Sequence, residues 1–270
     1  MKGTAHGVRV PAHGANGVSV DDFPQPGNLD KSKPVESVLA LPKAVRGVAL
    51  WWVRLDRTPA EVADLEATLS SEERVRAQRF GTDPLRQRWI VGRATLRMLL
   101  GRTLSIAPAA VALARGRRGR PQLADAPVDF NVSHTCGMAL IGIGDTLPAG
   151  VRIGVDVEHA DRRLNVDGLS AKFLSEAERA SLAPHAEDQR RRAFLRLWTC
   201  KEAMSKATGD ALSAPFRRLY VSIDHSLQLR DGPPPYVPAD WRLHALDMPD
   251  GFLATVAIWQ SPGPDSPSKS

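Results

Sequence analysis

Two acidic residues stand two positions apart near the middle of the chain, in a segment that alternates strictly between apolar and polar residues. The segment covers residues 151–158 and reads VRIGVDVE. Successive side chains of a β-strand point to opposite faces, so Asp156 and Glu158 present their carboxylates on one face, with Gly154 leaving room beside them. A hard divalent cation would relieve the repulsion between these carboxylates, and oxygen-only ligands favour magnesium. The alternation alone favours a simpler interpretation, a strand whose polar face is solvated.

A third carboxylate lies further along the chain, in a segment whose apolar spacing predicts a helix over residues 187–207. Glu202 and Lys206 are four residues apart and share one face of that helix. A Glu four residues before a Lys also forms a surface ion pair worth about 0.2 to 0.5 kcal/mol, and taken alone this interpretation is the simpler one. Alternatively, Lys201 and Lys206 meet phosphate charge while Glu202 meets a metal ion or a proton. That arrangement suits transfer of a phosphoryl group.

Two shorter motifs precede these segments, and all four occur in a fixed order. They lie at residues 119–121 (GRP), 130–135 (FNVSHT), 154–158 (GVDVE) and 198–206 (WTCKEAMSK). The series resembles the 4'-phosphopantetheinyl transferase family of the surfactin-synthetase type, whose motifs are G-[KR]-P, F-N-x-S-H-[ST], G-[IV]-D-[IV]-E and W-x-x-K-E-[AS]-x-x-K. Ala203 places the likeness in the branch that carries K-E-A, and the likeness covers roughly residues 47–260.

This resemblance implies transfer of the phosphopantetheine arm of coenzyme A to a serine of an apo acyl or peptidyl carrier protein, with release of adenosine 3',5'-bisphosphate. It implies that Asp156, Glu158 and Glu202 hold Mg²⁺, or Mn²⁺ in its place, together with the coenzyme A pyrophosphate. The proton of the attacking serine would pass to Glu202, or to a metal-bound water that Glu202 or Glu158 orients, and the residues do not decide between these. Lys206 would offset charge on the departing phosphate or protonate it, and Lys201 would help to hold the pyrophosphate.

The resemblance also implies residues for the nucleotide end of coenzyme A. Ser133 and His134 would contact the 3'-phosphate, although His134 read without the family is a hydrogen-bonded loop residue. Arg120 would flank the adenine through its backbone and the phosphates through its side chain. A basic set lies on predicted helices upstream, and each of its members taken singly fits a solvated surface. We expect Arg93, then Arg79 and Arg88, to face the coenzyme; the set also includes Arg74 and Arg76.

Composition restricts the class of protein. The chain has 270 residues and 43% hydrophobic content, which suits a globular protein with one large domain or two smaller ones. No segment approaches the roughly 20 apolar residues that cross a bilayer, so we expect no membrane partner and a cytoplasmic location. The two cysteines, Cys136 and Cys200, argue against a disulfide framework.

The positive charge of the chain suits anionic partners. The formal net charge is +6, and the sequence pI is about 9.7. A nucleic-acid-binding protein is therefore one alternative, but no zinc-finger or RNP-like motif occurs, and we expect no nucleic acid. Coenzyme A and carrier proteins are acidic and fit the same charge. A non-catalytic member that binds coenzyme A or a carrier protein is a second alternative, and the intact acidic motifs argue against it.

The order of predicted elements favours an α+β protein built from two similar halves. Helices followed by strands occur twice, and the family resemblance implies a pseudo-duplicated architecture with coenzyme A in the cleft between the halves. A single chain would then suffice, so we expect a monomer. The expected organisation is a mobile N-terminal tail over 1–45, an α+β half over 46–148, a second α+β half with the metal site over 149–260, and a loose tail over 261–270.

The strongest element predictions are the long ones. Helices are expected at residues 83–104, 175–183 and 187–207, with Ser175 and Glu178 forming a capping box. Strands are expected at 47–53, 129–132, 138–143, 151–158, 219–224, 241–247 and 252–259. The linker between the halves is expected near residues 145–150.

Overall fold

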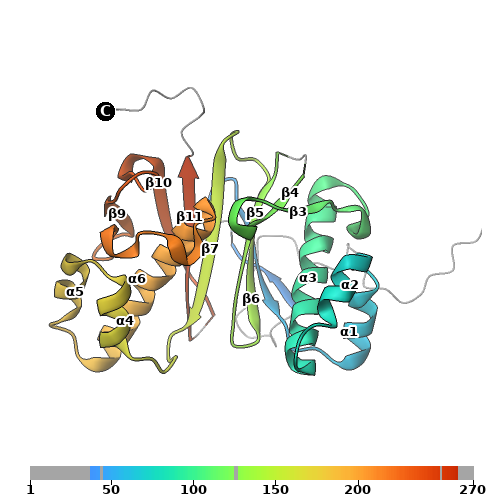
Figure 1. Cartoon of the computed structure of the whole chain (residues 1–270), viewed down its shortest axis with the longest axis horizontal. Coiled ribbons are helices and arrows are strands. Elements are labelled where there is room, and N and C mark those ends of the chain that lie inside the picture. The colour runs from blue at the N-terminus through green and yellow to red at the C-terminus, as the bar shows by residue number, and fades with distance from the viewer. Residues whose placement is uncertain (1–36, 43–44, 125–126, 250, 261–270) are drawn as a thin grey trace, which may run out of the picture.

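The computed structural model of the chain describes residues 37–42, 45–124, 127–249 and 251–260 (Figure 1). Its first half contains β1 (Val38–Ala40), β2 (Ala49–Arg54), α1 (Pro59–Glu66), α2 (Ser71–Ala77), α3 (Asp83–Leu104), β3 (Leu113–Arg115), β4 (Pro121–Leu123), β5 (Asp129–Thr135) and β6 (Met138–Gly144). Its second half contains β7 (Val151–His159), α4 (Val166–Phe173), α5 (Glu176–Leu182), α6 (Glu187–Thr208), β8 (Tyr220–Ser222), β9 (Gln228–Asp231), β10 (Trp241–Leu246) and β11 (Phe252–Gln260).

The two halves repeat one topology. Each has a strand, three helices that end in a long one, a short two-stranded ribbon and an antiparallel hairpin. The sheet orders β2-β6-β5 and β7-β11-β10 correspond strand for strand, and β1 extends the first sheet beside β2. The prediction of a pseudo-duplicated α+β fold is therefore confirmed. The halves meet at the connection from β6 to β7, within residues 145–150, where the linker was expected.

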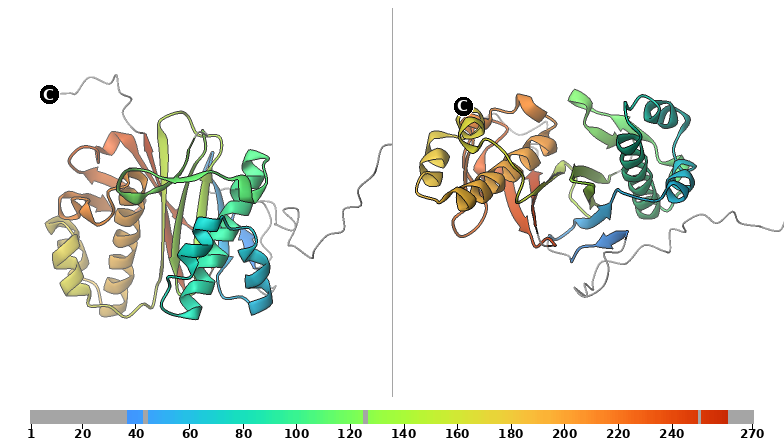
Figure 2. Two further views of the ribbon diagram at one scale, coloured as in Figure 1. Left: turned by 45° about the vertical axis from the view of Figure 1, so that its right-hand side comes forward. Right: turned by 90° about the horizontal axis from the view of Figure 1, so that it is seen from below.

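The elements form layers, with helices on the two outer sides and the two sheets between them (Figure 1). One apolar core lies between α1–α3 and the first sheet, and another between α4–α6 and the second sheet. A third core lies between the sheets, where Leu50, Trp52 and Leu140 of the first meet Val155 and Val157 of the second. Figure 2 shows the same arrangement from two further sides, with the helices of each half flanking the central strands.

The helices begin where short polar side chains can satisfy their first N–H groups. Thr58, Ser70 and Ser175 each form a capping box, at the starts of α1, α2 and α5 respectively. The long helix α6 ends at Gly209, whose φ of 82° lies in the left-handed region that glycine adopts without strain. Among the described residues, no helix has both the length and the apolar character that a membrane crossing needs.

Several sequence predictions need correction. Residues 38–41 were assigned to the N-terminal tail, but Val38, Ala40 and Leu41 are buried and β1 pairs with β2. The rest of that predicted tail up to residue 36, residues 43–44 and the predicted C-terminal tail over 261–270 lie outside the described residues. Helix α4, the ribbon β3–β4 and strand β9 were not predicted, because each is too short to show a clear period.

Candidate active site

The site is built where helix α6 crosses strand β7 at very close range. Gly154 makes this possible, because a Cβ there would collide with the carbonyl oxygen of Ala203 and would lie 2.7 Å from the Ala207 nitrogen. The face of β7 that carries Gly154 therefore lies directly against the α6 backbone. Two residues further along β7, Asp156 meets the side chains that α6 projects beside this contact.

Asp156 is the centre of a buried polar cluster. Its carboxylate is 5% exposed, and its Oδ1 accepts hydrogen bonds from Lys206 Nζ at 2.6 Å and from Ser133 Oγ at 2.8 Å. Lys206 Nζ also donates to Ser133 Oγ at 2.9 Å. Three elements thus meet at this carboxylate oxygen: β7 carries Asp156, α6 carries Lys206, and β5 of the first half carries Ser133. The ammonium group supplies the positive charge that this buried carboxylate needs.

Glu158 is the last acidic residue on this face of β7, and a side chain of the protein supplies its positive partner. Its side chain forms an ion pair with Arg162 and accepts a hydrogen bond from Thr135 Oγ1 at 3.4 Å. Burial raises the pKa of Glu158, the Arg162 charge lowers it, and the neighbouring Asp156 raises it further. Neither Arg162 nor Thr135 was assigned a role from the sequence. The spacing of four residues between Glu158 and Arg162 does not predict this ion pair from the sequence, because β7 ends at His159 and the residues after it are not helical.

Glu202 is a carboxyl group whose surroundings favour its protonated form. Burial, followed by the nearby Asp156 charge, raises its pKa to about 7, although the Lys206 ammonium acts in the opposite direction. A carboxyl with this pKa can gain or lose a proton near neutral pH.

Two buried carboxylate oxygens in the cluster accept no hydrogen bond: Asp156 Oδ2 and Glu202 Oε1. Because an unpaired buried acceptor is unfavourable, these oxygens fit a cation that would bind both. As the described side chains stand, however, no three or more of their His, Cys, Asp and Glu groups form a ready metal site. Lys206 and Arg162 explain this, since they occupy oxygens of Asp156 and Glu158.

Lys201 does not reach the cluster, contrary to the prediction that it helps to hold pyrophosphate. It is fully buried on another side of α6, where its Nζ lies 2.7 Å from Glu178 Oε2. It also donates to the carbonyl oxygens of Phe173, Phe216 and Leu219 at 3.2, 2.6 and 2.9 Å. These contacts use its donors, so Lys201 fastens α6 to its neighbours in the second half.

Ser133 and His134 point in opposite directions, because they are consecutive on β5. Ser133 is 4% exposed and turned toward β7, where its hydroxyl is bonded to Asp156, Lys206 and the Val157 N–H. Its hydroxyl is thus engaged within the protein, and its predicted contact with the 3'-phosphate stays a prediction. His134 is exposed and lies on the face of the first sheet that α3 covers.

The side chain of Arg120 is also committed within the protein. It is 7% exposed and forms a two-pronged ion pair with Asp129, at 2.9 and 2.8 Å. It donates at 2.9 Å to the carbonyl oxygens of both Lys206 and Ile153. Its donors are used at the junction of β5, β7 and α6, and its predicted contact with the coenzyme phosphates stays a prediction.

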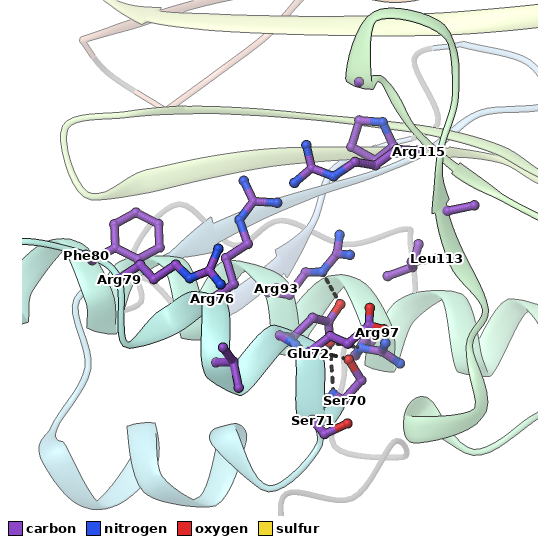
Figure 3. Close-up of a pocket in the computed structure, with 15 residues that line it drawn as sticks. Ser70, Ser71, Glu72, Arg76, Arg79, Phe80, Arg93, Arg97, Leu113 and Arg115 are labelled. Carbon is purple, nitrogen blue, oxygen red and sulfur yellow. Dashed lines mark hydrogen bonds and ion pairs between the residues drawn. The ribbon is translucent and has the colours of Figure 1, made fainter.

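A basic cavity of about 1010 Å³ opens in the first half, between α2, α3 and the ribbon β3–β4 (Figure 3). Arg79 and Arg93 line it, as does Arg76, whose guanidinium also lies over the Trp89 ring. Arg115 extends into it from β3, opposite Arg76 in Figure 3, and no motif had indicated this residue. Backbone at Gly119 and Pro121 closes one side, so the turn beside Arg120 borders the cavity.

The arginines predicted to face coenzyme A therefore divide into two groups. Within the described residues, Arg79 forms no ion pair, whereas Arg93 Nε lies 2.5 Å from Glu73 Oε1. Arg88 does not line the cavity and pairs instead with Asp56, with Nε 2.6 Å from Oδ1. We therefore exclude Arg88 from the basic cavity.

Comparison with known proteins identifies the family. A family model described as the 4'-phosphopantetheinyl transferase superfamily matches residues 152–257, and one described as 4'-phosphopantetheinyl transferase, N-terminal, matches residues 56–143. The 4'-phosphopantetheinyl transferase HetI of Nostoc sp. is 33% identical over 223 residues, covering 79% of this chain and 90% of HetI. A 4'-phosphopantetheinyl transferase of Bacillus subtilis is 26% identical over 193 residues, which cover 69% of this chain and 83% of that protein. The enzyme Sfp of Bacillus subtilis is 27% identical over 172 residues, covering 62% of this chain and 74% of Sfp. The two family models, the HetI match and the strand–helix site together show that the chain belongs to the 4'-phosphopantetheinyl transferase superfamily.

Proposed function

We propose that this chain transfers the 4'-phosphopantetheine arm of coenzyme A to a serine of an apo acyl or peptidyl carrier protein. The observation that carries the proposal is the buried cluster of Asp156, Glu202 and Lys206, which lies in the part of the chain that the superfamily model matches. In this reaction the serine oxygen bonds to the phosphorus that carries the pantetheine arm. The bond from that phosphorus to the other phosphate breaks, and adenosine 3',5'-bisphosphate leaves with its electron pair.

Glu202 is the proton acceptor that the geometry supports best. The attacking serine must lose a proton, and a general base works well when its pKa lies near the working pH. Burial and the neighbouring carboxylates raise the pKa of Glu202 to about 7, and its Oε1 has no hydrogen-bond donor of the protein. Glu202 would therefore take the serine proton at one carboxylate oxygen, while its other oxygen serves the metal set described below.

Lys206 supplies positive charge where phosphate charge develops. Its ammonium is 2.6 Å from Asp156 Oδ1, and the lysine side chain is 26% exposed. A part-buried ammonium stabilises a developing anion more strongly than one in open water does. We assign Lys206 to the departing phosphate.

Asp156, Glu158 and Glu202 are the residues that would hold magnesium, or manganese in its place. The unpaired Asp156 Oδ2 and Glu202 Oε1 and the all-oxygen character of the set support this assignment. When bound, the ion would neutralise charge on the pyrophosphate.

The basic cavity fits the nucleotide end of coenzyme A. Arg76, Arg79, Arg93 and Arg115 give it positive charge on several sides, and such a concave basic site suits phosphate groups. The exposed His134 ring is available to the 3'-phosphate, because no ion pair or hydrogen bond of the described residues engages its side chain. Both halves of one chain contribute to this arrangement, so we propose that a monomer acts.

The finer family assignment is the surfactin-synthetase type, in its K-E-A branch. It is supported by the motifs at residues 130–135, 154–158 and 198–206 and by the likeness to Sfp.

Intact-mass spectrometry of carrier proteins tests the proposal. Apo carrier proteins of the fatty-acid, polyketide and peptide-synthetase classes are incubated with the protein, coenzyme A and magnesium. We expect a mass gain of one phosphopantetheine that a chelator abolishes and that Glu202→Ala lacks. Coenzyme A binding without a mass gain on any carrier would contradict the proposed transfer and indicate a non-catalytic binding protein.

A further inference from the structure

Strand β7 has one edge that bonds to β11 and another that pairs with no strand in the part of the chain that the structure describes. On that second edge, side chains of β5 accept the backbone N–H groups. Asp129 Oδ2 accepts from Ile153 N at 2.7 Å, and Asn131 Oδ1 accepts from Val155 N at 3.0 Å. The third bond is from Val157 N to Ser133 Oγ, at 3.3 Å. We call Asp129, Asn131 and Ser133 the side-chain ladder.

The spacing of the side-chain ladder follows from the geometry of two strands. Residues two apart on β5 point to one face, and alternate N–H groups of β7 point to one edge. Asn131 and Ser133 are buried, at 7% and 4% exposure, so water does not compete for their hydrogen bonds. The register between the two halves is thus set by three side chains at fixed spacing.

Arg120 ties this ladder to helix α6. It holds the first member, Asp129, through both carboxylate oxygens, and it donates to the Ile153 carbonyl on the same edge of β7. It also donates to the Lys206 carbonyl, one of the last four of α6, which have no N–H partner within the helix. One guanidinium therefore fixes α6 relative to β5 and β7.

The ladder ends at the reacting groups. Its third member, Ser133, donates to Asp156 Oδ1 at 2.8 Å and accepts from Lys206 Nζ at 2.9 Å. A shift of β7 relative to α6 would therefore move Asp156 away from Lys206 and from Glu202, which α6 also carries, and would break up the proposed metal set.

We propose that the side-chain ladder and Arg120 are positioning residues, which set Asp156 and Lys206 in place. This inference rests on the proposed function only where kcat and KM of the transfer reaction are measured. It gives the first-half segment 129–133 a role in the site of the second half.

Asn131 offers the sharpest test, because it touches neither Asp156 nor Lys206 nor the basic cavity. Asn131→Leu removes the acceptor for the Val155 N–H, while Asn131→Asp keeps an oxygen in its place. Two readouts do not need coenzyme A: hydrogen exchange of the Val155 and Val157 amides, and Mn²⁺ affinity measured by electron paramagnetic resonance. We expect Asn131→Leu to speed exchange at both amides and to weaken Mn²⁺ binding by about tenfold. In the transfer assay it should lower kcat more than it raises the KM for coenzyme A. Asn131→Asp should have amide exchange, Mn²⁺ affinity and kcat close to those of the wild type.

Arg120→Lys separates positioning from coenzyme contact, because it keeps the positive charge but loses the two-pronged pair with Asp129. We expect weaker Mn²⁺ binding in the absence of coenzyme A. Arg115→Ala, in the basic cavity, is the matched control and should raise the KM for coenzyme A with unchanged Mn²⁺ affinity.

Wild-type Mn²⁺ affinity and amide exchange in both Asn131→Leu and Arg120→Lys would overturn the inference, even if transfer is confirmed. A wild-type protein that transfers nothing while its Mn²⁺ affinity still responds to Asn131→Leu would overturn the proposed function alone. Absence of Mn²⁺ binding by the wild type would contradict both.

Discussion

At the scale of single residues, two of the three carboxylates of the site already pair with cations that the chain supplies. Lys206 pairs with Asp156, and Arg162 pairs with Glu158. A divalent ion bound as proposed would compete with an ammonium and a guanidinium for these oxygens. Its binding would exchange one positive charge for another and would free Lys206 to meet phosphate.

Removal of the competing ammonium should strengthen metal binding. We expect Lys206→Met to tighten Mn²⁺ binding to the coenzyme-free protein by about tenfold, equivalent to about 1.4 kcal/mol, while turnover falls. Electron paramagnetic resonance titration measures the affinity, and mass spectrometry of the carrier protein measures the turnover. Lys172→Met is the control, because Lys172 is exposed on α4 over the Phe173 ring and carries the same charge. Weaker Mn²⁺ binding in Lys206→Met would show that the ammonium supports the metal site.

The pKa of Glu202 gives the metal-free protein a pH dependence of known sign. Burial, and then Asp156, raise this pKa to about 7 in the folded chain, above the ordinary carboxyl value of about 4.3. The folded state therefore favours the protonated form, and the stability from this group is complete below the ordinary value and is lost as pH rises through about 7. Thermal unfolding in chelator should show wild type losing stability over this range relative to Glu202→Gln, which does not titrate. Parallel curves for the two proteins would contradict the assignment.

The sequence placed the acidic residues of the site better than its basic ones. Asp156 and Glu158 follow from the strand period, and Glu202 and Lys206 from the helix period. Lys201 directly precedes Glu202, and neighbours in a helix point about 100° apart, so one of the two had to leave the site. Arg120 and Ser133 could not be placed, because a short motif does not say which side of a strand or turn faces a ligand.

At the scale of elements, the close contact between α6 and β7 determines the site. Gly154→Ala would force these elements apart, since its Cβ would meet the backbone at Ala203 and Ala207. We expect a loss of about 1 to 3 kcal/mol in the free energy of unfolding, together with loss of transfer. Chemical denaturation measures the first. Gly81→Ala is the control and should be nearly neutral, because no atom lies within 4 Å of a Cβ at that position. Equal stability of the two variants would rule out the close contact.

Lys201 and Glu178 join α6 to α5 through a fully buried ion pair. Removal of one partner leaves the other charge unpaired, so Lys201→Met should lower the free energy of unfolding by about 3 to 5 kcal/mol. The double variant Lys201→Met with Glu178→Gln should be more stable than the sum of the single effects predicts, which a double-mutant cycle by denaturation checks. Additive losses would mean that the two side chains act independently.

Long elements could be predicted from the sequence and short ones could not. Helix α3 has the bounds that its periodicity and flanking residues predict, and α6 ends one residue beyond the prediction. Helix α4 covers only Val166–Phe173, and the ribbon strands β3 and β4 have three residues each, too few to repeat a period. Tertiary contacts hold these short elements in place. The turn before β4 is an example, because Arg120 binds Asp129 of β5 and the Lys206 carbonyl of α6.

At the scale of the whole molecule, the two halves share a core. The apolar layer between the sheets contains Leu50 and Trp52 of one half with Val155 and Val157 of the other, all nearly inaccessible to solvent. Neither sheet has another partner for this face among the described residues. The halves should therefore unfold together, although each repeats a complete topology.

Calorimetry tests this cooperativity. We expect one transition whose calorimetric enthalpy equals its van't Hoff enthalpy. The separate second half, residues 149–260, should fail to fold because the apolar face of β7 would be exposed to water. Two resolved transitions, or a folded isolated half, would show that the shared layer contributes little.

The unpaired edge of β7 also has a consequence for the life of the protein in a crowded cell. Such an edge is a template for strands of other molecules, and proteins usually guard it with charges, bulges or a covering loop. Here the side-chain ladder on β5 protects the edge. Its three side chains accept the N–H groups of Ile153, Val155 and Val157. The guard works only while both halves are folded side by side. Because β5 precedes β7 along the chain, the covering side chains are synthesised before the edge that they cover.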